Sequence, residues 1–269
     1  METKNESEKV FEQYLDSNGF QGKWAYEPPI TGKSKHPDYL LDFGGKECFF
    51  EVKELRKKDN EPIERAAHID PYSSLRKKIH ELTKRKQFKE FKEYPCSLVV
   101  YSIDDRQFMS EPFWVFGVML GDRGLAATYD HDEGKVVAGS MRNEFLDGGK
   151  MIDPKKKRKQ NTTISAIVVL EEFPDNTKIQ KAFSKEIKKQ GRELTTVEKI
   201  GIRMKLCGHC PITRVPRVVV VENPYARIVF PADLFNGPFD ERWRIGNDRQ
   251  ERVFVGSKLK ELESLKCDF

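Results

Sequence analysis

The sequence of 269 residues contains no apolar run close to the ~20 residues that a membrane-spanning helix needs. Its first nine residues are mostly polar or charged and lack the apolar stretch of a secretory signal. Five cysteines, an odd number, argue against a disulfide framework. From these absences we expect an intracellular protein, cytoplasmic or, if the source is a eukaryote, nuclear.

The sequence also lacks an internal repeat and a long flexible linker. A hydrophobic content of 38% is average for a globular protein, and the length suffices for one substantial core. Segments typical of strands and segments typical of helices both occur. We therefore expect residues 1–269 to form a single elaborated α/β domain rather than two independent ones.

Ionisable residues flank two short apolar segments that follow one another closely. Pro37-Asp38 precedes Tyr39-Leu40-Leu41, and Glu51-Val52-Lys53 comes directly after Cys48-Phe49-Phe50, with Gly44-Gly45 between the two segments. The glycines predict a turn, which would fold Asp38 back beside Glu51. Because side chains alternate along a strand, Glu51 and Lys53 would share one face. The spacing therefore predicts that three ionisable groups converge.

Such a combination is typical of a nuclease centre. Asp38 and Glu51 offer hard carboxylate oxygens to Mg²⁺, for which Mn²⁺ would substitute, and the backbone carbonyl of Val52 is a further candidate ligand. A bound metal acidifies a water molecule and stabilises the charge that grows on a phosphate. The Lys53 ammonium would orient or deprotonate the attacking water and add positive charge at the transition state.

An acidic-x-Lys triplet alone carries no weight in a chain that is 34% charged, and Glu90-Phe91-Lys92 is one of several others. Glu51-Val52-Lys53 differs because it follows both a strand-like run and a Pro-Asp. A later Pro174-Asp175 has no strand-borne acidic-x-Lys behind it. The competing interpretation of Asp38, Glu51 and Lys53 is a polar hairpin face with an ordinary salt bridge.

Pro37-Asp38 and Glu51-Val52-Lys53 together resemble the motif of the PD-(D/E)XK nuclease superfamily, which has the restriction-endonuclease-like fold. The resemblance covers about the first hundred residues. It implies an α/β fold with a mixed central sheet flanked by helices and with C-terminal elaborations. The catalytic core would lie at about residues 1–105, and a sheet-completing and accessory part at about 106–269.

The resemblance also implies an acidic residue on the helix before the first catalytic strand. Residues 10–15 form an amphipathic segment that Asn18-Gly19 would end. Glu12 is the first candidate for a catalytic and metal-binding role, and Glu8 is the second. Either carboxylate would otherwise be a solvated group on the helix surface.

In many members of this superfamily a helix follows the second catalytic strand, carries a Lys or Gln towards the metal and leads into another buried strand. Apolar residues at 72, 75, 79 and 82 predict a helix that ends before Pro95, and residues 96–101 have the pattern of a buried strand. Lys77, His80, Lys84 and Gln87 would lie along one side of this helix. Lys84 and Gln87 would approach the scissile phosphate or, alternatively, only face solvent.

The formal charge of +5 is modest, but basic residues gather between Leu75 and Lys92. Eight occur there against Glu81 and Glu90: Arg76, Lys77, Lys78, Lys84, Arg85, Lys86, Lys89 and Lys92. We interpret this span as a phosphate-backbone surface in which Lys77, Lys84, Arg85, Lys86 and Gln87 bind nucleic acid, so that binding weakens with salt. A solubilising helix surface is the simpler alternative.

Beyond Tyr101 the patterns are coarser. Residues 113–120 are apolar, residues 126–138 resemble a hairpin, and residues 147–161 form a loop rich in Gly, Pro and Lys. Residues 164–170 and 217–221 have the composition of core strands, and residues 176–206 form a long charged helical region.

Three further motifs have competing interpretations. Pro154-Lys155-Lys156-Lys157-Arg158-Lys159 suits contact with DNA, plain solvation or a nuclear-import signal. Cys207-Gly208-His209-Cys210 suits structural cysteines, half a zinc site or, against its context after a helical region, a redox pair. Asn223-Pro224-Tyr225-Ala226 predicts a turn after a strand.

We therefore expect a Mg²⁺-dependent phosphodiesterase that cuts nucleic acid, most directly a DNA endonuclease. Two copies related by a two-fold axis are a common way to cut both strands, so a homodimer is one expectation for the partner. A rival hypothesis is a catalytically silent nucleic-acid-binding or interaction module on the same fold. A weaker rival is a thiol oxidoreductase that uses Cys207 and Cys210.

Overall fold

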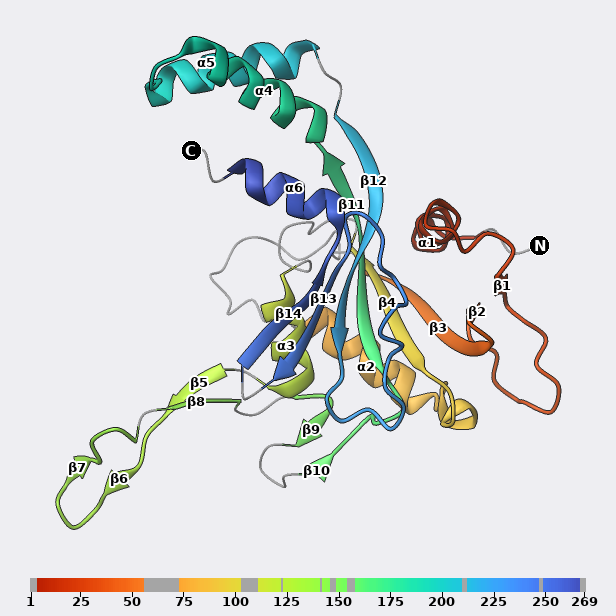
Figure 1. Ribbon diagram of the computed structural model, residues 1–269. Helices are drawn as coiled ribbons and strands as arrows, with labels where there is room; N and C mark the ends of the chain where they lie inside the picture. Colours follow the sequence, from red (N-terminus) through yellow and green to blue (C-terminus); the bar gives the residue numbers. More distant parts are fainter. Residues whose placement is uncertain are drawn as a thin grey trace, which may run out of the picture.

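The computed structural model describes residues 4–55, 73–102, 111–121, 123–140, 142–145, 149–153, 158–209, 212–246 and 249–266. A mixed central sheet is flanked by helices on both faces, and two slender projections extend from it (Figure 1). This agrees with the expected α/β class with a mixed sheet. Within the described ranges, no helix combines the length and the apolar character required to cross a membrane.

Eight strands form the central sheet in the order β1-β2-β3-β4-β11-β12-β13-β14. The pairs β3–β4, β4–β11 and β12–β13 are parallel, and the other neighbours are antiparallel. Strands from both halves of the chain therefore share one sheet. Their bounds are β1 Trp24–Tyr26, β2 Tyr39–Phe43, β3 Lys46–Leu55, β4 Cys96–Ser102, β11 Ala166–Asp175, β12 Thr213–Glu222, β13 Glu241–Gly246 and β14 Arg249–Val255.

Helices cover both faces of this sheet or extend beyond its ends. They are α1 Glu6–Ser17, α2 Ser73–Lys84, α3 Pro112–Leu120, α4 Thr177–Gln190, α5 Thr196–His209 and α6 Ser257–Lys266, with a short 3-10 helix at Lys89–Phe91. Six short strands make three small two-stranded ribbons outside the main sheet. They are β5 Arg123–Ala126, β6 Tyr129–Asp130, β7 Lys135–Val136, β8 Arg142–Phe145, β9 Ile152–Asp153 and β10 Arg158–Lys159.

Helix α1 has a capping residue at its start and a glycine just past its end. The Asn5 side chain accepts a hydrogen bond from the Glu8 backbone, and the Glu8 carboxylate accepts one from the Asn5 backbone, which completes a capping box. Gly19 has a positive φ of 83° just past the last turn. Phe11, Tyr14 and Leu15 are fully buried, so the predicted amphipathic helix is confirmed.

The β2–β3 hairpin is also as predicted. Gly44 and Gly45 have φ values of 61° and 77°, which glycine adopts at no steric cost and which a two-residue turn with two positive φ values requires. Phe43 pairs with Lys46 and Tyr39 pairs with Phe50. This register brings the residue before β2, Asp38, towards Glu51 and Val52.

Alternation along the strands divides the core into two parts. Phe49 and Leu98 face one side, where they pack with α2, α3 and the 3-10 helix. Phe50 and Val99 face the other side, where they pack with α1 and with Phe235. Because β3 and β4 are parallel, the chain needs a crossover between them, and α2 lies within that connection.

After Tyr101, the predicted strands and the charged helical region are present, but their bounds differ from the predicted ones. The predicted core strands at 164–170 and 217–221 lie within longer strands, β11 and β12, and the strand at 96–101 corresponds to β4. The charged region at 176–206 is two helices separated by Gly191, which has a φ of 63°. The apolar residues 113–120 belong to α3, and the hairpin at 126–138 contains β6 and β7.

Candidate active site

The hairpin brings Asp38, Glu51 and Lys53 together where β3 continues past the first residue of β2. The Asp38 carboxylate accepts a hydrogen bond from the Val52 backbone at 2.8 Å. The Lys53 ammonium lies 2.7 Å from Glu51 Oε1 and 3.3 Å from Asp38 Oδ2. The predicted convergence of these three side chains is therefore present in the structure.

Glu51 is the most constrained of the three groups. Its side chain is 8% exposed, and within the described part of the chain Oε2 accepts no hydrogen bond of normal geometry. Burial raises the pKa of this carboxyl group, the Asp38 charge raises it further, and Lys53 and Gln87 lower it in part. A buried carboxylate oxygen beside a second carboxylate is costly unless a cation approaches.

Lys53 keeps its positive charge in these surroundings. Burial alone would lower the pKa of the ammonium, but Asp38 and Glu51 outweigh burial and raise the pKa above its usual value. About a quarter of the side chain, 28%, stays exposed to solvent. Lys53 is therefore a protonated donor that a bound anion can reach.

The two acidic candidates of α1 have different contacts. Glu12 accepts a hydrogen bond from the Tyr39 hydroxyl at 2.9 Å and pairs with Lys4, both through Oε1. The Glu8 carboxylate accepts the hydrogen bond from the Asn5 backbone in the capping box. Burial raises the pKa of Glu8, and among the nearby charges Asp38 raises it and Lys53 lowers it. Glu8 thus lies within electrostatic reach of Asp38 and Lys53, and the catalytic and metal-binding role of Glu12 stays a prediction.

Tyr26 and Glu27 lie beside Asp38, which was not predicted from the sequence. The Glu27 backbone donates a hydrogen bond to the Asp38 carbonyl at 2.8 Å, which closes the loop between β1 and β2. Burial, together with the charges of Glu8, Glu27 and Asp38, raises the pKa of Tyr26 to about 12. No spacing in the sequence links this segment to Asp38; only the β1–β2 pairing brings it there.

Gln87 joins the site, whereas Lys84 does not. The Gln87 amide donates to the His36 carbonyl at 2.8 Å and also lies close enough to Glu51 to lower the pKa of that carboxyl group. Lys84 is exposed at the last position of α2, and no interaction joins it to Asp38, Glu51 or Lys53. Gln87 therefore holds the backbone just before Asp38 in place.

The predicted phosphate-binding surface is open to solvent. Lys77, Lys84, Arg85 and Lys86 are all exposed, as is His80. Apolar Leu75, Ile79 and Leu82 anchor the other side of α2 in the core. The helix therefore presents the basic residues outwards, which both the nucleic-acid interpretation and the solubilising alternative require.

The described residues of the three remaining motifs make no hydrogen bond or ion pair with Asp38, Glu51 or Lys53. Residues 154–157 of the basic run and Cys210 are outside the described residues, and Arg158 and Lys159 form the exposed strand β10. Cys207 is an exposed free thiol in the last turns of α5. Asn223 makes the predicted turn, because its side chain bonds both the Ile164 carbonyl and the Tyr225 backbone.

The residues present suit an oxygen-preferring divalent cation. Asp38 and Glu51 supply two carboxylates, one of which has a buried oxygen without a normal hydrogen bond. Within the described ranges, no group of three or more His, Cys, Asp or Glu side chains is close enough to hold a metal. A cation would thus complete its shell with the Val52 carbonyl, water and substrate oxygens, as Mg²⁺ commonly does.

Comparison of this chain with protein-family models, with curated proteins and with solved structures finds no match.

Proposed function

We propose that this chain is a Mg²⁺-dependent phosphodiesterase that cuts nucleic acid, most directly a DNA endonuclease of the restriction-endonuclease-like type. The observation that carries the proposal is the buried Glu51 carboxylate beside Asp38, with one oxygen lacking a normal hydrogen bond and with Lys53 protonated next to both. A salt bridge alone does not require a buried carboxylate oxygen without a hydrogen-bond partner. Among the described residues that Glu51 oxygen is open to a cation.

Each residue has a role that its position allows. Asp38 and Glu51, with the Val52 carbonyl, would hold Mg²⁺, which supplies an acidified water and positive charge when bound. Lys53 donates hydrogen bonds to the attacking water or to a non-bridging phosphate oxygen. Gln87 donates a hydrogen bond to the His36 carbonyl and so holds the segment that contains Asp38 in place. Glu8 adds a third carboxylate at the edge of the site.

The order of the elements also supports the proposal. A helix, a hairpin with the acidic groups, a crossover that contains a helix and a parallel buried strand follow one another as α1, β2–β3, α2 and β4. This is the order that the resemblance to the PD-(D/E)XK superfamily implies. The exposed basic residues of α2 lie on the same connection and suit a phosphate backbone.

The test is cleavage of plasmid DNA and of single-stranded DNA with Mg²⁺ or Mn²⁺. Asp38→Ala, Glu51→Ala and Lys53→Ala should each abolish cleavage, because each removes a group from the reacting centre. Glu47→Gln is the matched control, since Glu47 is an exposed carboxylate on the same strand, near the other end of β3. Undiminished cleavage by all three site variants would refute the proposal.

A second candidate function is a nucleic-acid-binding module without catalysis. The exposed basic residues of α2 favour it, because they do not depend on the acidic site. The two candidates differ in one result. A module binds DNA in a salt-dependent manner with or without Mg²⁺. Its affinity for DNA is then the same in the wild type and in the three site variants.

A further inference from the structure

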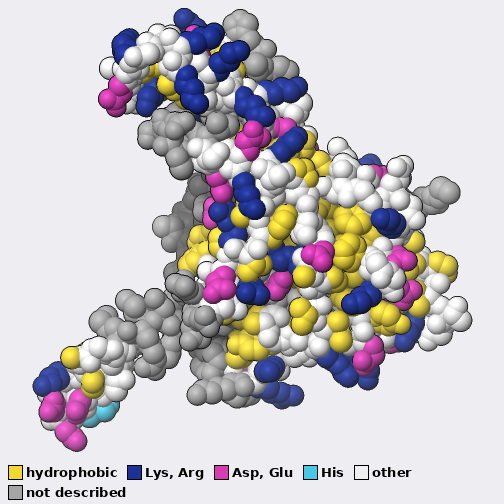
Figure 2. Space-filling model, in the orientation of Figure 1, with side chains coloured by type: hydrophobic (Ala, Val, Ile, Leu, Met, Phe, Trp, Pro, Cys, Tyr) yellow, Lys and Arg dark blue, Asp and Glu magenta, His cyan; other side chains and the backbone are white. Residues whose placement is uncertain are grey.

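The pair of helices α4 and α5 projects from one end of the central sheet, and its surface is rich in Lys and Arg (Figures 1 and 2). Helix α4 alone carries five lysines and a single acidic residue, Glu186. The five lysines are all exposed: Lys178, Lys181, Lys185, Lys188 and Lys189. A charge excess of this size on one helix raises the question of what it binds.

These five side chains form one continuous row along α4. The first four follow one another at steps of three and four residues, and Lys189 stands four residues after Lys185, which places all five on the same side of a helix. The row spans about 16 Å at ~1.5 Å per residue. Ile179 and Phe183 are buried on the opposite side and hold the helix in place. We refer to Lys178, Lys181, Lys185, Lys188 and Lys189 as the α4 lysine row.

The row is poorly neutralised by the protein itself. Lys181 pairs with Glu261 of α6 at 2.9 Å, and Lys189 pairs with Glu186 at 3.0 Å. Within the described residues no acidic group pairs with the other three lysines, Lys178, Lys185 and Lys188. Like charges at these spacings destabilise a helix, so an anionic partner would remove a repulsion that the free protein retains.

Topology places the row on the same end of the sheet as the candidate active site. Strands β3, β4 and β11 are mutually parallel, and Lys53, Val100 and Val169 are neighbours across them. Helix α4 departs from the far end of β11, which continues from Val169 to Asp175. At ~3.3 Å per residue, the end of β11 stands about 20 Å beyond the level of Lys53, which is about six base pairs of a duplex. Helix α4 begins two residues later, at Thr177.

We propose that the α4 lysine row is a second phosphate-binding surface, which contacts the backbone of the same nucleic acid several base pairs from the bond that is cut. This inference rests on the proposed function for its substrate. An anionic lipid surface is the less suitable partner, since α4 exposes no large apolar side chain to insert into lipid. The exposed apolar residues of this projection, such as Val197 and Met204, belong to α5.

The experiment measures the affinity of the full chain for a labelled DNA duplex of about 30 base pairs by fluorescence anisotropy over a series of NaCl concentrations, without divalent metal. A Lys185→Gln, Lys188→Gln double variant should bind on the order of tenfold more weakly at low salt. Its plot of log affinity against log salt should be flatter by about 1.8, that is ~0.9 for each lost contact.

The matched control is a Lys23→Gln, Lys46→Gln double variant, which removes the same charge from exposed positions near the β2–β3 turn. Affinity and salt slope that are equal in the two double variants would overturn the inference. Binding to vesicles that contain phosphatidylserine is measured in parallel. A lysine-row variant that loses affinity for these vesicles but not for the duplex would also overturn the inference. Unchanged circular dichroism and thermal midpoint verify that the variants are folded.

Failure of this inference and failure of the proposed function give different results. If the lysine-row variant binds like its control while Asp38→Ala abolishes cleavage, the second surface is refuted and the phosphodiesterase stands. If the wild-type protein binds the duplex through the row but cleaves nothing with Mg²⁺ or Mn²⁺, the phosphodiesterase is refuted and the second surface stands.

Discussion

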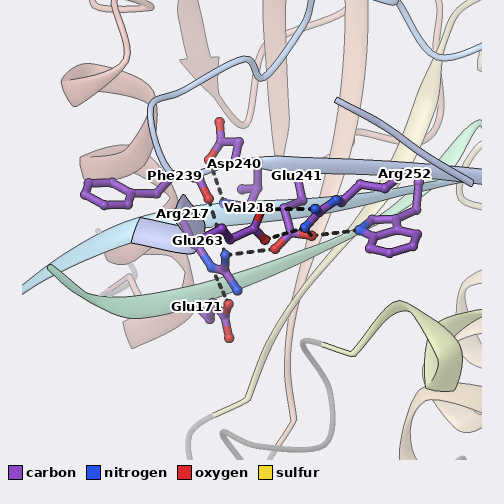
Figure 3. A network of polar contacts seen from close by, with 9 residues as sticks. Glu171, Arg217, Val218, Phe239, Asp240, Glu241, Arg252 and Glu263 are labelled. Atoms are coloured by element: carbon purple, nitrogen blue, oxygen red, sulfur yellow. Dashed lines mark hydrogen bonds and ion pairs between the residues drawn. The ribbon is translucent and has the colours of Figure 1, made fainter. Parts of the chain in front are cut away.

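Two clusters of charged residues on the same sheet have opposite designs. Around Arg217, charges of alternating sign satisfy one another: Arg217 contacts Glu171 and Glu241, and Arg252 contacts Glu241 and Glu263 (Figure 3). Around Lys53, two carboxylates converge on one ammonium and a Glu51 oxygen lacks a normal hydrogen bond. Every charged group of the first cluster has a partner within the protein, whereas in the second, among the described residues, a buried carboxylate oxygen is left without one.

Backbone and ring contacts reinforce the completeness of the Arg217 cluster. Arg217 also donates to the Phe239 carbonyl at 3.3 Å and stacks over the Phe173 ring at 4.1 Å. Glu241 accepts a hydrogen bond from the Trp243 ring nitrogen at 2.9 Å. The contacts join β11, β12 and β13 with the C-terminal α6. We therefore assign this cluster to stability, in contrast to the cation binding that the proposed function gives to the Lys53 cluster.

The largest effect that tests this comparison is expected for Arg217→Met. The substitution would leave Glu171 and Glu241 without their shared cation in a largely buried setting, where breaking an ion pair costs about 3–5 kcal/mol. Urea unfolding measures the change. Lys135→Met is the control, because its ion pair with Glu133 is exposed and should contribute less than about 1 kcal/mol. Equal losses in both variants would contradict the assignment to stability.

A smaller effect of opposite sign is expected for Glu51→Gln in metal-free buffer. The substitution removes a buried charge that repels Asp38, so the free energy of unfolding should rise by about 1 kcal/mol. Cleavage should disappear in the same variant. The exposed Glu47→Gln should change neither property. A loss of stability in Glu51→Gln would show that the Lys53 salt bridge, and not the binding of a cation, is what this cluster provides.

The smallest effect concerns the pH dependence of stability at Asp240. This carboxyl group is 1% exposed, and burial raises its pKa despite hydrogen bonds from Tyr14, Val218 and Gly237. A raised folded-state pKa means that folding favours the protonated form. The stability of the wild type relative to Asp240→Asn should therefore be greatest below the unfolded pKa of about 3.9 and decline as the pH rises through the raised value. Thermal unfolding from pH 3 to pH 7 measures it; a rise in this difference with pH would contradict the sign.

Local features of the sequence were sufficient to predict the centre of the candidate site. The alternation of a strand and two glycines with positive φ decide the positions of Asp38, Glu51 and Lys53, and all of this information lies within sixteen residues. The choice between Glu8 and Glu12 could not be made in the same way. The two are one helical turn apart, and only the structure shows that Glu12 contacts Tyr39 and Lys4 whereas Glu8 caps the helix.

Features that depend on distant contacts were not predicted. Strands β13 and β14 have polar residues at most positions, so their sequence carries no strand pattern, and they form because Arg242 and Glu241 bond to β12 and its surroundings. The apolar residues of α3 are buried on nearly every side, which removes the periodicity that distinguishes a helix. The lysines of α4 are visible in the sequence, but only the sheet order shows that they share an end with Lys53.

The most direct test of the central claim is the binding of Mn²⁺ to the full chain, measured by titration calorimetry with wild type, Glu51→Gln and the control Glu47→Gln. If the Glu51 and Asp38 carboxylates form a cation site, the wild type and the Glu47→Gln control should bind one Mn²⁺ with similar affinity. Glu51→Gln should bind at least about tenfold more weakly, because one of the two charged ligands is lost. Equal Mn²⁺ binding by all three proteins, or none by the wild type, would contradict the account.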